Sequence, residues 1–221
     1  MKPRLSQNHL AAMTLFEIGV VVAIVMILAV LLLPTLANSR RKSSRINCTN
    51  NLKQLGLAYR IWEGDNGDKY PMQVSVSLGG AQEMVTTGNV TQVFQVMSNE
   101  LSTPKILLCP NDLTRSWATN FDRLVNSNIS YFVGVDVTNE VNPNLILSGD
   151  SHFVLKGVPV KPGLRCFWTN DPPAWAANRH GDTGPCGNIG LADSSVQSVT
   201  ASGLRHYLEQ TGLATNRLAL P

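Results

Sequence analysis

The chain has 221 residues, of which 15% are charged, a formal net charge of +3 and four cysteines. This length suits one ordinary domain, and the low charge excludes a disordered acidic or basic chain. Four cysteines in a chain of this length also exclude a small scaffold held together by many disulfides.

The first predicted element is an apolar helix over residues 13–33. Residues 18–33 read IGVVVAIVMILAVLLL and carry no charge. Together with the residues just before them they make about 21 residues, or roughly 31 Å of helix, which matches the thickness of a bilayer core. We therefore predict a single membrane span. The alternative is a secretory signal peptide cleaved after Ala37. Glu17 argues against it, because a carboxylate inside such a run costs about 2.5–3.5 kcal/mol on insertion and marks a functional position.

The residues around this run form a recognisable pattern. Residues 12–17 read AMTLFE, and the apolar run and Pro34 follow. This resembles the N-terminus of type IV prepilins and type II secretion pseudopilins, whose pattern is Gly, Phe, Thr, Leu, any residue, Glu and then an apolar run. The chain departs from it at Ala12 and Met13. The resemblance implies that a prepilin peptidase cleaves between Ala12 and Met13, and that the new N-terminal Met13 is N-methylated.

The same resemblance assigns Glu17 and Pro34 to assembly. Cleavage creates a positive α-amine at Met13, and methylation keeps that charge. In a helical filament the Glu17 carboxylate of one subunit can pair with the amine of a neighbour. Such a pair specifies the register between subunits and leaves neither charge buried alone.

Residues 34–63 are predicted to continue the helix as an amphipathic half. Pro34 should kink the helix rather than end it, because apolar residues with helical spacing resume after it. That apolar stripe consists of Cys48, Leu52, Leu55, Tyr59 and Trp62. The segment also holds six basic residues and no acid between positions 38 and 62, which predicts contact with lipid headgroups. Nucleic-acid binding is the alternative; we do not expect it, because no aromatic residues alternate with the basic ones.

Residues 64–221 are predicted to form an extracytoplasmic globular head. Alternating apolar residues over 72–78 predict a strand, and residues 89–101 predict a helix with Asn89 and Gln92 as a capping box. Further strands are predicted over 106–109, 129–135, 145–147, 153–158 and 165–168. Residues 187–192 and 195–200 flank a hairpin turn at Asp193-Ser194, and residues 202–210 form a short helix ended by Gly212. The predicted fold class is α+β, a long N-terminal helix packed on a mainly antiparallel, pilin-like β-sheet.

Further motifs extend from residue 48 toward the C-terminus. Residues 48–71 read CTNNLKQLGLAYRIWEGDNGDKYP, residues 109–112 read CPND, and His180, Asn188 and Asp193 follow an RHxGxxNxxFADGHV-like pattern. These motifs resemble a bacterial pseudopilin-like family named for a C-terminal H-X9-DG feature. The chain differs from it by a longer gap between His180 and Asp193 and by Ser194 in place of a glycine. The resemblance implies a pilin-like fold and no chemistry, so the role of these three motif residues stays open.

The four cysteines predict disulfides. No Cys-x-x-Cys motif occurs, which argues against a zinc site. Outside the cytoplasm the predicted pairs are Cys48–Cys109 and Cys166–Cys186, one of three connectivities that four cysteines allow. Buried reduced thiols are the alternative.

We expect no enzyme, no metal and no cofactor. The sequence has no P-loop and no dinucleotide fingerprint. Residues 149–151 read GDS, as in a group of esterases, but none of His152, His180 and His206 has the required Asp three positions before it. Calcium is the alternative kept open for the loop-rich segment that holds Asp182, Asn188 and Asp193, because major pseudopilins bind calcium in such a region through oxygen ligands.

The predicted function is that of a structural subunit of a type II secretion pseudopilus or a related type IV pilus-like filament. Its expected partners are the prepilin peptidase, other pilin-like subunits, an inner-membrane assembly platform and membrane lipids. Its expected location is the bacterial inner membrane, crossed once, with the N-terminus cytoplasmic and the head extracytoplasmic. The alternatives are a signal-anchored extracytoplasmic binding module that does not polymerise, and a secreted protein cleaved after Ala37.

Overall fold

The structure is a computed structural model, and it describes residues 15–137, 142–170, 172–176, 180 and 184–221, with only the backbone described for 32–41. The predicted cleavage site between Ala12 and Met13 lies outside the described residues. The chain divides into two compact units, residues 1–42 and 43–221, and each is considered by itself. We call residues 43–221 the head.

The first element is α1, a helix of 51 residues over Leu15–Asp65. As predicted, the helix does not end at Pro34. Every described side chain from 15 to 31 is exposed. Within the described part of the chain, no helix is both long enough and apolar enough to cross a membrane. The predicted span over residues 13–33 therefore stays a prediction.

The C-terminal end of α1 belongs to the head, and its apolar stripe is buried as predicted. The five stripe residues are at most 5% exposed, and they share one core cluster with residues of the main sheet. The helix ends where Gly67 and Asp68 take positive φ angles of 68° and 57°, which starts the predicted turn after Gly64.

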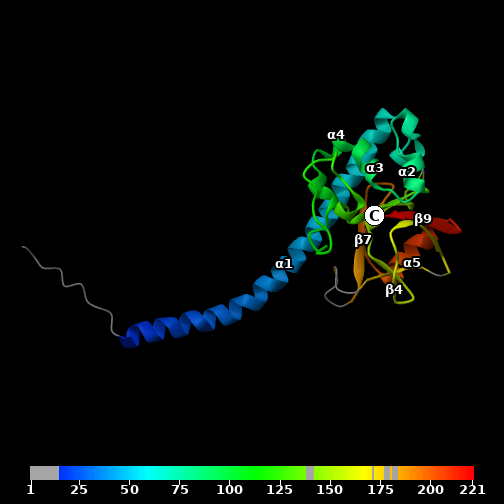
Figure 1. Cartoon of the computed structure of the whole chain (residues 1–221). Helices are drawn as coiled ribbons and strands as arrows, with labels where there is room; N and C mark the ends of the chain where they lie inside the picture. The colour runs from blue at the N-terminus through cyan, green and yellow to red at the C-terminus, as the bar shows by residue number, and fades with distance from the viewer. Residues whose placement is uncertain (1–14, 138–141, 171, 177–179, 181–183) are drawn as a thin grey trace, which may run out of the picture. The chain divides into compact units, whose positions relative to one another are not determined.

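Residues 66–130 are built from short helices rather than strands. Their bounds are η1 Pro71–Gln73, η2 Val76–Leu78, α2 Gln82–Thr86, α3 Thr91–Val96, α4 Ser98–Leu101, η3 Pro104–Leu107 and η4 Asn126–Asn128. The helices α2 and α3 lie beside the cyan C-terminal end of α1 (Figure 1).

Two predicted strands in this region are wrong. Residues 72–78 form η1 and η2, because Pro71 starts the first turn and the Ser75 hydroxyl accepts a hydrogen bond from the Ser77 amide. Residues 106–109 do not form a strand for the same reason: Pro104 starts η3, and the Thr103 hydroxyl caps this helix. In both segments local turn chemistry outweighs the apolar alternation.

The helix predicted over 89–101 is present as two pieces, α3 and α4, which meet at Met97. Its apolar face is buried as predicted, with Val90, Val93, Phe94, Met97 and Leu101 at most 4% exposed. The predicted capping box is wrong: the Asn89 side chain accepts from the Thr91 amide at 3.0 Å, two residues on instead of three.

A six-stranded antiparallel sheet forms the centre of the head. Its strands are β1 Tyr131–Gly134, β2 Ile146–Asp150, β5 Gly163–Trp168, β7 Cys186–Leu191, β8 Val196–Thr200 and β9 Thr215–Leu220, in the order β5-β9-β1-β2-β7-β8. Five of these six strands overlap predicted segments, and β1 and β8 lie wholly within them. No strand is predicted over 215–220, where β9 lies between β5 and β1. The predicted α+β class with a mainly antiparallel sheet is confirmed.

The smaller sheet has three strands in the order β4-β3-β6, namely β4 Val158–Pro159, β3 Phe153–Leu155 and β6 Ala174–Trp175. The single strand predicted over 153–158 is instead the hairpin β3–β4. Lys156 and Gly157 have φ angles of 51° and 81°, as a tight turn with two left-handed residues requires.

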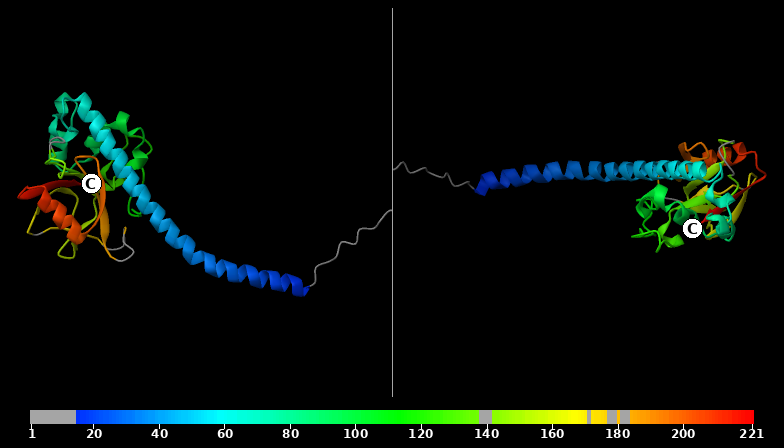
Figure 2. Two further views of the ribbon diagram at one scale, coloured as in Figure 1. Left: turned by 180° about the vertical axis from the view of Figure 1, so that it is seen from behind. Right: turned by 90° about the horizontal axis from the view of Figure 1, so that it is seen from above.

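The strands β1, β2 and β7 of the main sheet are buried on both faces. Alternate residues of β1 enter different cores: Tyr131 and Val133 join the cluster that holds the α1 stripe, whereas Phe132 joins the cluster that holds Leu204 and Leu208. These two leucines belong to α5 Ala201–Gln210, which is seen in orange on the head in Figure 2. The main sheet thus separates α1 on one face from α5 and the smaller sheet on the other.

Candidate functional site

Most of the sequence motifs meet in one cluster of buried and half-buried polar side chains within the head. Its residues come from α1, from the loop after η3, from the end of β2 and the loop just after it, and from β7. His180, which precedes β7 in sequence, completes the cluster. We call this cluster the polar centre. It consists of Cys48, Cys109, Asn111, Asp112, Asp150, His152, His180 and Asn188.

A disulfide joins the polar centre to α1. Cys48 and Cys109 are bonded, with their Cα atoms 5.0 Å apart, and both are at most 1% exposed. The structure therefore forms the first predicted pair. It closes a loop across a sequence separation of 61 residues, and so ties the helix to the loop that follows η3.

The second predicted pair, Cys166–Cys186, is wrong. Cys166 is exposed on β5, whereas Cys186 is buried at the start of β7, and neither is in a disulfide. The strands β9, β1 and β2 lie between β5 and β7. Four strand spacings amount to about 19 Å, whereas bonded cysteines have Cα atoms about 4.4–6.8 Å apart.

His180 lies between three other residues of the polar centre. Its Nε2 is 3.2 Å from Asp150 Oδ2 and 3.5 Å from Cys109 Sγ, and its Nδ1 is 3.2 Å from Asn111 Nδ2. His180 is only 6% exposed. With Asn111 Nδ2 as a donor, the network assigns the proton of a neutral imidazole to Nε2, which then donates to Asp150.

Asn188 holds the Asp150 carboxylate. Its backbone amide and its Nδ2 both donate to Asp150 Oδ2, at 2.7 and 3.0 Å. Thr49 on α1 in turn donates to Asn188 Oδ1 at 3.4 Å. Several donors around one buried carboxylate compensate its loss of water.

Asp112 is the second buried carboxylate of the polar centre. Its Oδ1 accepts from the Thr114 hydroxyl at 2.7 Å and its Oδ2 from the Ser130 hydroxyl at 2.9 Å. Arg115 Nε lies 3.3 Å and His152 Nε2 3.5 Å from the same Oδ2. A buried carboxylate with this many donors acts as a cross-link between loop and strand.

Arg115 extends this network to three backbone carbonyls. Its guanidinium donates to the carbonyl of Asn126 at 2.7 Å, to that of Pro221 at 3.1 Å and to that of Ile129. The sequence offered no signal for this role, because a single arginine in a loop has no pattern that reveals three acceptors.

Two buried tyrosines, Tyr59 on α1 and Tyr131 on β1, keep their phenol protons. Burial first, and then the Asp150 carboxylate, raise the pKa of Tyr131 well above its usual value of 10.0. Burial, and then Tyr70, raise the pKa of Tyr59 in the same direction. Neither phenol can serve as a base near neutral pH.

Asp193, the third motif residue, lies outside the polar centre. It occupies the turn between β7 and β8, where its Oδ1 accepts from the Ser195 amide at 2.8 Å. The next residue, Ser194, has a φ of 66°, a conformation that glycine adopts without strain. The structure therefore gives Asp193 a turn-forming role and keeps it apart from His180 and Asn188.

The calcium alternative gains no support from these positions. Asp182 lies outside the described residues. The Asn188 side-chain amide donates to Asp150 and its oxygen accepts from Thr49, while Asp193 caps a surface turn.

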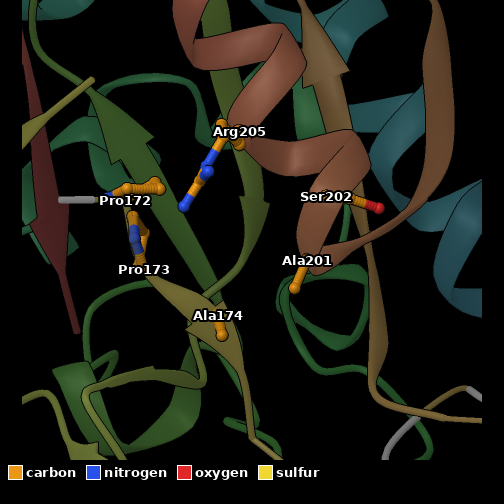
Figure 3. Close-up of a pocket in the computed structure, with 6 residues that line it drawn as sticks. All are labelled: Pro172, Pro173, Ala174, Ala201, Ser202 and Arg205. Atoms are coloured by element: carbon orange, nitrogen blue, oxygen red, sulfur yellow. The ribbon is translucent and has the colours of Figure 1, made fainter. Parts of the chain in front are cut away.

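Two features limit the chemistry that the polar centre offers. The Cys109 sulfur is bonded to Cys48, so it offers no thiolate, and both carboxylates are at most 3% exposed. A separate pocket of about 320 Å³ is lined by Pro172, Pro173, Ala174, Ala201, Ser202 and Arg205. Figure 3 shows Arg205 reaching from α5 toward the two prolines. Among these six described residues, Arg205 is the cation and Ser202 the hydroxyl, and the six include no histidine or carboxylate that could serve as a base for that hydroxyl.

Comparison with known proteins gives no family. No family model matches the chain, and no curated protein and no solved structure matches it. The resemblance to prepilins therefore depends on the sequence motifs, and what it implies about function is a proposal.

Proposed function

We propose that this chain is a structural subunit of a pseudopilus or a related pilus-like filament. One observation carries the proposal: thirteen large apolar side chains between Leu15 and Leu31 are exposed around the acid Glu17. Covering side chains of this size is worth about 1.5–3 kcal/mol each, or roughly 20–40 kcal/mol together. Such a surface needs a cover, and neighbouring copies of the same helix provide one.

The head supports this proposal through its attachment to α1. The apolar stripe at the C-terminal end of α1 is part of the head core. The Cys48–Cys109 disulfide and the Thr49–Asn188 hydrogen bond fix this end of the helix to the rest of the head. A subunit packed into a filament through its helix must carry its head without separation. The buried disulfide keeps the C-terminal end of α1 fixed within the head and so serves that need.

The proposal includes a stage before assembly in which the subunit is held in the membrane. The apolar sequence over residues 13–33 supports this stage. In that stage the helix lies in the inner membrane with the head outside the cytoplasm. A prepilin peptidase then cleaves after Ala12, and Glu17 pairs with the methylated amine of Met13 on a neighbour. The proposed function is structural, and the chain performs no reaction.

N-terminal sequencing of the mature protein tests the processing step. A start at N-methylated Met13 is expected. A start at Asn38 would mean secretion after signal cleavage, and an intact Met1 would mean a permanent anchor; either start would contradict the proposal.

A Glu17→Ala variant tests assembly. It should remain in the membrane fraction but fail to enter filaments sheared from cells. The matched control is Glu209→Ala, which removes one exposed acid from α5 and should assemble normally. Normal incorporation of the Glu17→Ala subunit would refute the role of this carboxylate.

A further inference from the structure

The atoms around the Cys48–Cys109 disulfide have the chemistry of a metal site. The two sulfurs and a ring nitrogen of His180 all lie within 4.8 Å of one another, and all three residues are buried. A carboxylate oxygen of Asp150 lies 3.2 Å from His180 Nε2. Thiolate, imidazole and carboxylate are the ligand types that zinc takes in proteins.

We propose that the chain binds one zinc ion through Cys48, Cys109, His180 and Asp150 when the disulfide is reduced. This inference goes beyond the proposed structural function and does not depend on it. It assigns the polar centre two alternative cross-links, a disulfide in oxidising surroundings and a metal ion in reducing ones.

Two of the distances between the proposed ligand atoms match those of a tetrahedral zinc site. With bonds of about 2.3 Å to sulfur and about 2.0–2.1 Å to nitrogen or oxygen, a sulfur and a nitrogen ligand are about 3.5 Å apart, and a nitrogen and an oxygen ligand about 3.3 Å. Cys109 Sγ and His180 Nε2 are 3.5 Å apart, and His180 Nε2 and Asp150 Oδ2 are 3.2 Å apart. Reduction releases Cys48, which supplies the fourth ligand by a change of its side-chain torsion.

The surroundings can hold these ligands in place. Asn188 fixes Asp150 through two hydrogen bonds, and Asn111 faces the other ring nitrogen of His180. A histidine that binds zinc through Nε2 carries its proton on Nδ1 and donates it to an outer acceptor. Asn111 provides this acceptor by turning its amide, so that Oδ1 instead of Nδ2 faces the ring.

The reaction balances with a dithiol reductant. The reductant gives two electrons and two protons to the Cys48–Cys109 bond, becomes a disulfide itself and leaves two thiols in the chain. Zinc then displaces both thiol protons, and the proton on His180 Nε2 is replaced by one on Nδ1. The resulting site has four protein ligands and no open position, which is typical of a structural rather than a catalytic zinc site.

The test compares the full chain in detergent micelles with and without a phosphine reductant. One water molecule supplies the oxygen of the phosphine oxide and the two protons of the thiols as the phosphine reduces the disulfide. Each sample is refolded with zinc chloride, separated from unbound metal by gel filtration, and analysed for zinc. The expected result is one zinc per reduced chain and none per oxidised chain. Equal zinc in both samples, or none in the reduced sample, would overturn the proposal.

Variants and labelling locate the metal. His180→Gln and Cys109→Ser should weaken zinc binding at least tenfold, whereas the control Cys166→Ser should bind as the parent does. Because the first two variants can also fail to fold, alkylation of the reduced parent chain gives an independent measure. Zinc should protect Cys48 and Cys109 from iodoacetamide; protection of Cys166 and Cys186 instead would place the metal elsewhere and refute the assignment.

Discussion

Removal of the Cys48–Cys109 disulfide should destabilise the head by an amount that follows from the loop it closes. The bond spans a sequence separation of 61 residues. In the chain-entropy treatment, a cross-link of this span lowers the entropy of the unfolded chain enough to stabilise the fold by about 4 kcal/mol. For a chain of this size that corresponds to a fall in Tm of about 8–16 °C.

The assay is urea denaturation of the double variant Cys48→Ala/Cys109→Ala, with a chelator present so that no metal contributes. The double substitution avoids leaving one reactive thiol behind. Cys166→Ala is the control, because it removes an exposed cysteine outside any disulfide, and its unfolding midpoint should not change. A loss of less than about 1 kcal/mol in the double variant would refute the entropic reasoning, since it would mean that the loop is already ordered in the unfolded chain.

Three further predictions concern the head. Arg115→Ala should lower the free energy of unfolding by about 3 kcal/mol, because it removes one charged donor from the buried Asp112 carboxylate and from three backbone oxygens; chemical denaturation measures it. Gly187→Ala should cost about 1–3 kcal/mol, because a Cβ there would lie 2.6 Å from the Trp175 ring; thermal unfolding measures it. The pKa of Glu83 is lowered by hydrogen bonds from the Ser75 hydroxyl and from a backbone amide, so its contribution to stability is present above pH 4.5 and is lost as the pH falls through its folded-state pKa. Glu83→Gln should flatten that part of the stability profile.

Each of these predictions has a matched control. Arg123→Ala removes an exposed arginine, Gly184→Ala adds a Cβ where nothing lies within 4 Å, and Glu209→Gln neutralises an exposed acid. All three controls should stay within about 0.5 kcal/mol of the parent. Equal effects in a variant and its control would show that the named contact is not the cause.

The strongest periodic patterns predicted their elements well. The helical half over 34–63 and its buried stripe follow from five apolar residues at helical spacing, and α1 ends within two residues of the predicted position. The hairpin of β7 and β8 follows from two apolar runs around Asp193-Ser194, and the two strands pair as predicted.

The wrong predictions have local causes. Pro71 and Pro104 each start a tight turn inside a segment whose apolar alternation indicates a strand. The strand β9 shows no clear alternation, because three consecutive residues, Leu218 to Leu220, are buried and the polar Asn216 is buried as well.

The candidate site was visible only in part. The motif residues His180 and Asn188 indicated the right region, but their common partner Asp150 belongs to a segment that the sequence suggests only as an esterase-like GDS motif. Contacts between residues far apart in the chain have no sequence period, so Arg115 and its distant acceptors could not be predicted.

The position of β9 has a consequence for the order in which the head folds. This strand pairs with β1 on one side and β5 on the other, although it follows both in sequence, by more than 80 and more than 45 residues respectively. Pairings over such distances close long loops and form late. Until β9 is in place, β1 and β5 each expose an unpaired edge, which is a surface for association with other chains. The head should therefore fold slowly, and its aggregation during refolding should depend on concentration more steeply than that of a sheet made of consecutive hairpins.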